Sequence, residues 1–392
     1  MTLQRYRREP SSLSQGVLLA AMLFVFMSSV NMMGSGFGLL GEGFARMLLT
    51  LTENPFTGIL IGMVMTAVVQ SSSMTTSMAV AMVSEGVIPI DNAVPVVMGA
   101  NVGTTITCIL VALGYVGRRG RFRRAFAAGT MHDFFNVLTV IILLPIEYYT
   151  RILRRSAVWM ADHFAEFTHF SSARSPLRIV TGKPAEWLRY MLIDTVGLSA
   201  RAAGIVMIVV ALLLLFVSLY YMTRLLKGFM AARMSNILDK YLFRNAVTAL
   251  LVGVVFTAAV QSSSVTTGLV VPLVTAGVLT HVQAFPYTMG ANLGTTVTGI
   301  LAALARGDTL GLSIAFVHML FNMSGVAIFL PIKRIRHIPV SLALWLANLT
   351  LISRWYAVGF ILIMFFVVPF IGIFGWRWFV GVFGTMWSGQ GL

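Results

Sequence analysis

Long apolar segments alternate with short polar connections along most of the chain. A helix needs about 20 apolar residues to cross the ~30 Å hydrocarbon core of a bilayer. Full-length membrane helices are predicted at 12–40, 92–116, 125–146, 198–223, 284–305 and 311–332, and 333–392 adds a C-terminal membrane segment. The pattern therefore predicts an all-α integral membrane protein with about eight full-length helices.

Two further apolar segments, 54–90 and 245–280, are each interrupted by the polar sequence Gln-Ser-Ser-Ser. The arms of the first, 54–70 and 74–90, have about 17 residues and reach only ~25 Å at 1.5 Å per residue. Irregular backbone at membrane depth is tolerated where it is buried in protein or lines a cavity. We therefore predict two re-entrant helical hairpins with the polar sequence at each tip.

A duplication relates the two hairpins. Residues 54–113 align with 245–304 without a gap, 191 positions later, and 32 of 60 residues are identical. A third match joins HDFFNVLTVIILLPI at 132–146 to HMLFNMSGVAIFLPI at 318–332. Self-similarity of this extent predicts two homologous halves.

The predicted organisation has four parts. An N-terminal part (1–146) holds the first helix and the first repeat, and an external loop (147–197) follows it. The second repeat occupies 198–332, and the C-terminal membrane segment occupies 333–392.

Composition and charge agree with the membrane assignment. The chain has 58% apolar and 10% charged residues, whereas soluble domains carry about 25% charged residues. The net charge of +15 comes from Lys and Arg between the apolar segments, which indicates the anionic cytoplasmic leaflet of the lipid bilayer and not nucleic acid. The single cysteine, Cys108, excludes an intramolecular disulfide.

The basic connections also predict a topology. With Arg5, Arg7 and Arg8 in the cytoplasm, the basic stretches 118–124, 224–244 and 333–336 all lie on the cytoplasmic side. Arg151, Arg154 and Arg155 fall outside, in the long loop, where the charge rule is weak. Three crossings separate the hairpins, so the repeats are predicted to be inverted. We expect a multi-pass protein of the cell's inner (plasma) membrane with a cytoplasmic N-terminus.

Inverted repeats with broken helices place a substrate site near the middle of the membrane. Hydroxyls and helix N-termini at the hairpin tips suit an oxyanion, while amide and hydroxyl oxygens suit a small cation. Gly99 and Gly103 flank Asn101, as Gly290 and Gly294 flank Asn292, which predicts an unwound helix in each repeat. An anion with coupled cations is the expected occupant. Neither motif contains Arg or Lys.

Other polar residues carry weaker predictions. His132 and Asn136 share a helix face, as do His318 and Asn322. With one imidazole per half, interhelical hydrogen bonding is favoured over a metal site. Asp133 is expected to pair with a loop arginine. Serine beside histidine suggests an intramembrane hydrolase, but catalytic triads are not usually duplicated, so we predict no enzyme.

Two QSSS hairpins, each followed by GAN-x-GTT, resemble the type II sodium/phosphate cotransporter family. Residues 122–147 and 354–382 resemble further stretches of that family. The resemblance implies uptake of inorganic phosphate driven by the inward sodium gradient, with sodium as coupling ion and no other cofactor. On this basis, the expected phosphate-binding residues are Ser71, Ser72, Ser73, Ser262, Ser263, Ser264, Asn101 and Asn292. The expected sodium-binding residues are Gln70, Gln261, Thr66, Thr104, Thr257 and Thr295.

The chain also departs from the family. Its external loop is short and lacks cysteine, which indicates a bacterial-type member. Where charge-moving members have an aspartate, this chain has Gly43, so the sodium number and the charge moved per cycle stay open, as does the oligomeric state. A sodium-coupled transporter of another oxyanion, such as sulfate or a dicarboxylate, is the alternative, and an arginine facing the site would favour a carboxylate. A passive channel or a membrane scaffold is a third possibility.

Overall fold

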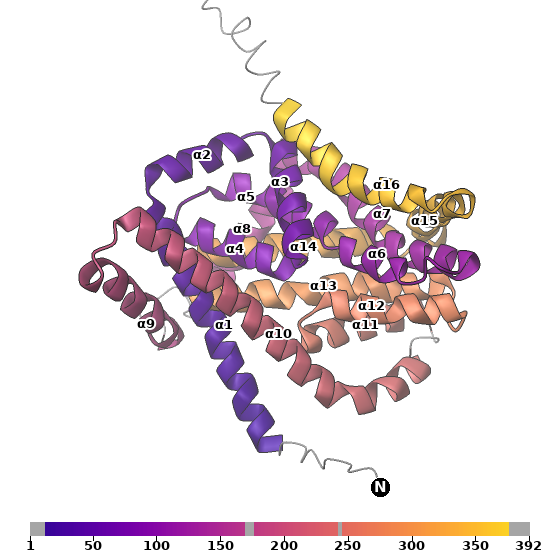
Figure 1. The fold of residues 1–392 in the computed structure, drawn as a ribbon, viewed down its shortest axis with the longest axis horizontal. Helices are drawn as coiled ribbons and strands as arrows, with labels where there is room; N and C mark the ends of the chain where they lie inside the picture. Colours follow the sequence, from indigo (N-terminus) through magenta and orange to yellow (C-terminus); the bar gives the residue numbers. More distant parts are fainter. Residues whose placement is uncertain (1–11, 169–175, 242–244, 376–392) are drawn as a thin grey trace, which may run out of the picture.

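The computed structural model describes residues 12–168, 176–241 and 245–375, and every regular element in these ranges is helical (Figure 1). Eight of the described helices are long and apolar enough to cross a membrane, which confirms an all-α membrane protein: Gln15–Leu40, Ile90–Leu113, Arg119–Thr150, Ala200–Leu225, His281–Arg306, Thr309–Phe329, Lys333–Ile352 and Trp355–Gly375. Arg5, Arg7 and Arg8, together with the end of the C-terminal segment (376–392), lie outside the described residues.

The first repeat contains the predicted hairpin arms and the helices that follow them, and also a helix over 42–52 that was not predicted. Its helices are α1 (Ser12–Leu40), α2 (Glu42–Thr52), α3 (Pro55–Val69), α4 (Ser72–Ser84), α5 (Ile90–Gly103), α6 (Ile106–Leu113) and α7 (Arg119–Thr150). The chain bends by 108° between α2 and α3. There Asn54 accepts a hydrogen bond from the Phe56 backbone N–H at 2.8 Å, and Pro55 supplies the preset φ of a first helical position.

The second repeat contains the equivalent hairpin arms and following helices, but one continuous helix takes the place of α5 and α6, and no described helix corresponds to α2. Its helices are α10 (Ala200–Tyr241), α11 (Ala246–Val260), α12 (Ser263–Ala276), α13 (His281–Arg306) and α14 (Thr309–Phe329). Asn245 caps α11 with a reciprocal bond pair to Thr248, so both hairpins begin at a capping asparagine. The C-terminal segment forms α15 (Lys333–Ile352) and α16 (Trp355–Leu362), and a π-helical turn (Ile363–Val367) continues α16.

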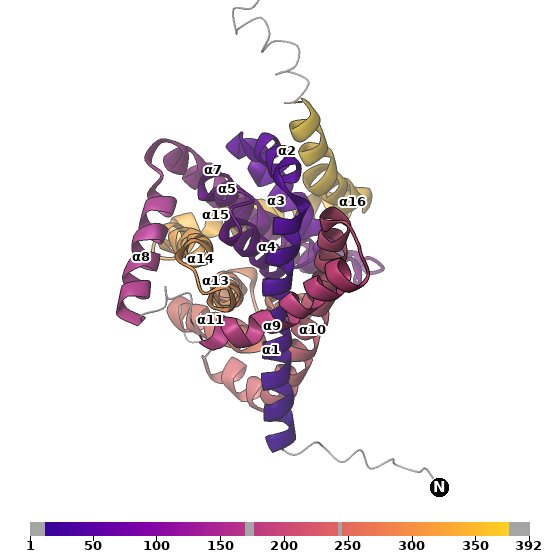
Figure 2. The same ribbon diagram turned by 90° about the vertical axis from the view of Figure 1, so that its left-hand side faces the viewer.

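The expected external loop is largely helical, which corrects the prediction for 147–197. It contains α8 (Ile152–Thr168), α9 (Pro176–Tyr190) and a π-helical turn (Met191–Thr195). In α8, Leu153, Ala157, Ala161 and Ala165 recur every four residues and are buried, and the helix packs on α14 at the outside of the molecule (Figure 2). The basic stretch 118–124 also differs from a loop, because α7 already begins at Arg119.

Only one of the two predicted broken helices is interrupted. Between α5 and α6, Thr104 and Thr105 leave the helix, whereas α13 continues through the equivalent Thr295 and Thr296. The Asn136 amide explains the difference, because it donates to the Asn101 carbonyl at 2.6 Å, the group that would accept the Thr105 N–H in a continuous helix. That N–H lies instead 3.4 Å from the Val102 carbonyl oxygen. The break predicted within 284–305 was therefore wrong.

Glycines let one arm of each hairpin pack closely on its neighbouring helix. A methyl group at Gly99 would overlap the Ile59 carbonyl, and one at Gly290 would overlap the Leu250 carbonyl. Such backbone contacts between helices need a residue without a side chain. They fix α3 on α5 and α11 on α13.

The second arm of each hairpin packs across the boundary between the halves. Helix α4 packs on α13 and α14 of the second half, and α12 packs on α6 and α7 of the first half. Each hairpin therefore joins both halves, and this exchange brings the two tips into the interior of the molecule.

Candidate functional site

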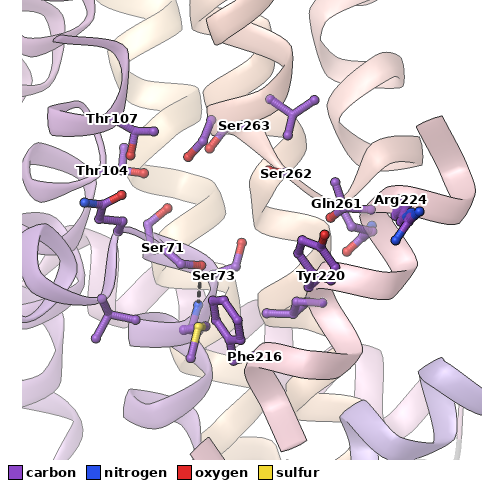
Figure 3. Close-up of a pocket in the computed structure, with 18 of the residues that line it drawn as sticks. Ser71, Ser73, Thr104, Thr107, Phe216, Tyr220, Arg224, Gln261, Ser262 and Ser263 are labelled. Atoms are coloured by element: carbon purple, nitrogen blue, oxygen red, sulfur yellow. Dashed lines mark hydrogen bonds between the residues drawn. The ribbon is translucent and has the colours of Figure 1, made fainter. Parts of the chain in front are cut away.

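The two hairpin tips line a single cavity of about 680 Å³. All eight residues of the two QSSS sequences contribute to its wall: Gln70, Ser71, Ser72, Ser73, Gln261, Ser262, Ser263 and Ser264. Corresponding residues of the two tips are 191 positions apart, and Figure 3 shows Ser71 and Ser73 approaching the cavity from different helices than Ser262 and Ser263. The two hairpin tips, which the sequence predicted to form a pair, thus lie at the same cavity.

Each tip has the same unusual backbone. Gln70 (φ 56°) and Gln261 (φ 57°) adopt the left-handed conformation, which is uncommon for a residue with a side chain. Their backbone N–H groups bond to the carbonyls of Thr66 (2.6 Å) and Thr257 (2.7 Å). This closes α3 and α11 and lets the next helix start two residues later.

The breaks place opposite helix ends side by side. The N-termini of α4 and α12, at Ser72 and Ser263, carry unbonded N–H groups and partial positive charge at the cavity. The carbonyl ends of α3 and α11 carry partial negative charge next to them. A cavity built in this way can hold an anion and small cations together without a fixed charge at its tips.

Thr66 and Thr257 lie inside the hairpins and not on the cavity wall. Thr66 Oγ1 is 2.8 Å from Thr75 Oγ1, and Thr257 Oγ1 is 2.7 Å from Thr266 Oγ1. All four side chains are buried. These paired hydroxyls join the two arms of each hairpin and hold the tip in place.

The predicted threonines of the following helices divide between two locations. Thr104, at the interruption of α5 and α6, lines the cavity. Its equivalent Thr295 is buried in continuous α13, where its hydroxyl donates to the Ala291 carbonyl at 3.0 Å. Thr295 is not part of the cavity wall.

Asn101 and Asn292 belong to a buried network behind the cavity and do not line it. The network consists of Asn101, Asn136, Asn292, His318 and Asn322, all nearly inaccessible to solvent. Asn101 Oδ1 lies 3.1 Å from His318 Nε2 and accepts from Asn322 Nδ2 at 3.0 Å. Asn292 Nδ2 donates to Asn136 at 2.9 Å and to Asn322 at 2.5 Å.

This network connects α5, α7, α13 and α14, so it joins the two repeats at the centre of the molecule. It agrees with the prediction of interhelical hydrogen bonding for Asn136, His318 and Asn322. His132 departs from that prediction, because it is buried and neither ring nitrogen has a hydrogen-bond partner among the described residues. Across the part of the chain that the structure describes, no group of three His, Cys, Asp or Glu could hold a metal ion.

Asp133 does not form the expected ion pair with a loop arginine. Its side chain is 1% exposed, and neither carboxylate oxygen has a hydrogen-bond partner among the described residues. The reason is its place on α7, several turns into the interior from the arginines at the start of that helix.

The two equivalent glutamines have different surroundings. Gln261 is 7% exposed, donates to the Ala258 carbonyl at 2.5 Å and accepts from Thr298 Oγ1 at 2.7 Å. The Gln70 side chain is exposed and has no hydrogen-bond partner within the described ranges. Thr107, which corresponds to Thr298, has a buried hydroxyl without a partner in the same ranges.

One face of α10 completes the cavity, and sequence reasoning did not identify it. Phe216, Leu219, Tyr220, Thr223 and Arg224 recur at helical spacing and line the wall. The signal was available, because Tyr220, Thr223 and Arg224 interrupt an apolar run on one face. It was missed because α10 lies outside the duplicated motifs.

A partly buried ion pair forms at the far end of α4, where only connections were expected. Arg306, at the end of α13, is 4% exposed and pairs with Glu85. Its other terminal nitrogen lies 3.4 Å from Asn31 Oδ1 of α1, and Asn31 Nδ2 donates to the Ala305 carbonyl at 3.1 Å. Gly34 leaves the space that the guanidinium fills. The ion pair ties together helices of both halves.

Comparisons with known proteins cover both repeats. A family model described as Na+/Pi-cotransporter matches residues 25–154 and 213–354. Sodium-dependent phosphate transport protein 2B of Homo sapiens is 31% identical over 460 residues, which cover 93% of this chain and 66% of the relative. Sodium-dependent phosphate transport protein 2A of Ovis aries is 30% identical over 456 residues, covering 97% of this chain and 71% of the relative.

The chain thus spans 66% of the length of the human relative. No solved structure matches it at a significant level.

Proposed function

The chain belongs to the Na+/Pi-cotransporter family, and on that basis we propose that it carries inorganic phosphate across a membrane together with sodium ions. The observation that carries the proposal is the single cavity lined by both QSSS tips. The inward sodium gradient would drive phosphate uptake, and the protein would act as a transporter and not as an enzyme.

The cavity offers donors that suit a tetrahedral oxyanion. The six tip serines supply hydroxyls, and the starts of α4 and α12 supply backbone N–H groups. These neutral donors would hold phosphate by hydrogen bonds and helix dipoles. A site without a fixed cation at its tips can also release the anion in each cycle.

Sodium would bind beside the phosphate, where oxygen atoms gather. Gln70, Gln261 and Thr104 line the wall next to the carbonyl ends of α3 and α11. Amide, hydroxyl and carbonyl oxygens are suitable ligands for a small hard cation. Only residues of the cavity wall would contact the ions directly. The other predicted residues would hold the helices around the cavity in place without touching the ions: Thr66, Thr257, Thr295, Asn101 and Asn292.

Alternating access around this cavity would complete the transport cycle. The repeats are proposed to be inverted in the membrane, so that one hairpin enters from each side. Support comes from the equal local structure of the two tips and from the exchange of α4 and α12 between the halves. The protein would reside in the plasma membrane with a cytoplasmic N-terminus.

Uptake of radiolabelled phosphate into liposomes that contain the purified full chain tests the proposal. We expect accumulation with sodium outside and none with choline outside. Uptake that is indifferent to sodium would contradict sodium coupling. Arg224 lines the cavity wall, and an arginine facing the site is the feature expected of a carboxylate transporter. Competition by sulfate or succinate, without competition by arsenate, would therefore identify a transporter of another oxyanion.

A further inference from the structure

Among the described residues that line the cavity, Arg224 is the only charged one. It extends the α10 face of Tyr220 and Thr223 by one residue, so its position follows from helical spacing. Figure 3 shows it beside Gln261, at the opposite edge of the view from Thr104 and Thr107.

Within the described part of the chain, no acidic side chain forms an ion pair with this arginine. The ion pairs of the described residues use Arg46, Arg154 and Arg306. Arg224 is exposed, and none of the hydrogen bonds found in the described ranges involves its side chain. A full positive charge therefore stands at the solvent-accessible part of a cavity whose other polar groups are neutral.

We propose that Arg224 is a capture residue, which raises the local concentration of the anion at the cavity whenever the cavity is open to the side of the membrane on which Arg224 lies. In the proposed topology this is the cytoplasmic side, so the residue acts on the release and rebinding of the anion there. The inference rests on the proposed function and adds the residue that supplies long-range attraction. Hydrogen bonds of the serines act only at contact distance, whereas a charge acts over roughly 10 Å at 0.1 M salt. Walls of low dielectric constant focus that field at the cavity.

The position on α10 suits capture better than tight binding. Arg224 belongs to neither hairpin, so it can attract the anion without becoming a fixed ligand at the tips. Its effect should be electrostatic, because a lysine at the same position would preserve it. It should also weaken as ionic strength rises, because exposed charges are screened by salt.

An exposed arginine near a helix end could instead serve only as an anchor to anionic lipid headgroups. Binding of radiolabelled inorganic phosphate to the detergent-solubilised full chain separates the two roles, because the bilayer is absent. Sodium is held constant, and choline chloride sets a low or a high ionic strength. The variants are Arg224→Gln, Arg224→Lys and, as a matched control on the same helix outside the cavity wall, Arg201→Gln.

We expect Arg224→Gln to raise the Kd for phosphate about fivefold at low ionic strength, the size expected for a unit charge near a divalent anion in water. The difference should shrink at high ionic strength, and Arg224→Lys and Arg201→Gln should bind like the parent chain. Equal binding by Arg224→Gln and the parent at both salt concentrations would overturn the proposal. So would a loss that is independent of salt and is shared by Arg224→Lys. A parent chain that binds no phosphate would overturn the proposed function as well, which distinguishes the two failures.

Discussion

The Gln261 side chain at the second hairpin tip makes two hydrogen bonds, whereas the Gln70 side chain at the first tip makes none with the described residues. Gln261 accepts a hydrogen bond from Thr298 at 2.7 Å, while Gln70 is exposed and Thr107 has no partner among the described residues. The backbone of the two tips is nevertheless the same, with φ of 56° and 57°. Equal sequence therefore fixes the shape of the tip, and the surrounding helices determine the partners of its side chains.

The helices behind the tips show a related difference. The α5–α6 pair is interrupted at Thr104 and Thr105, while α13 is continuous. The Gln261 side chain makes two hydrogen bonds that the Gln70 side chain does not make with the described residues, and each contributes about 1 kcal/mol. A difference of this size is small enough for each tip to adopt the arrangement of the other.

The largest loss of stability is expected from substitutions at the close glycine contacts that both halves share. Gly99→Leu and Gly290→Leu should each prevent folding, because the added side chain would overlap the backbone of Ile59 or Leu250. Size-exclusion chromatography of the solubilised variants measures this. Gly268→Ala, where nothing lies within 4 Å, should behave like the parent chain. A folded Gly99→Leu beside an unfolded Gly290→Leu would show that the two halves do not share this contact.

Substitution of the glutamines should separate function from stability. Gln70→Ala and Gln261→Ala are both expected to abolish sodium-driven phosphate uptake, because both residues line the cavity. Only Gln261→Ala should also lower the melting temperature in detergent, because it leaves Thr298 unpaired. Normal uptake by both variants, at normal expression, would exclude these residues from the site.

The smallest change in stability is expected from substitutions of Thr298 and Thr107, the threonines beside the two glutamines. Thr298→Val should cost about 1–3 kcal/mol of stability, because the Gln261 side chain loses its buried donor. Thr107→Val should change the melting temperature little, because its hydroxyl has no partner in the described part of the chain. Thermal unfolding of the two variants in the same detergent measures the difference. Equal destabilisation by both substitutions would contradict the observed asymmetry of the tips.

The features that the sequence predicted well depend on local chemistry. A polar run at the centre of a short apolar segment has few arrangements that satisfy its backbone in a membrane, so the breaks at Gln70 and Gln261 could be predicted. Capping by Asn54 and Asn245 marks the start of each hairpin in the same local way.

The features that it missed depend on contacts between distant segments. The Asn136 amide interrupts one helix and leaves its equivalent intact, and repeated sequence cannot reveal this difference. Arg306 pairs with Glu85 although 221 residues separate them. Arg224 reaches the cavity from a helix without a polar motif. In α8, the buried residues at every fourth position were a readable signal that charge counting in the long loop concealed.

The exchange of hairpin arms has a consequence for how such a chain arose. A polypeptide with one half alone would leave α4 without its contacts to α13 and α14, or α12 without its contacts to α6 and α7. An ancestor that encoded a single half would therefore have needed two copies to bury these arms. Gene duplication and fusion would then have joined an obligate pair, and each half became free to diverge. Gln261 and Gln70, with one side chain held and the other free, record that divergence within a shared backbone.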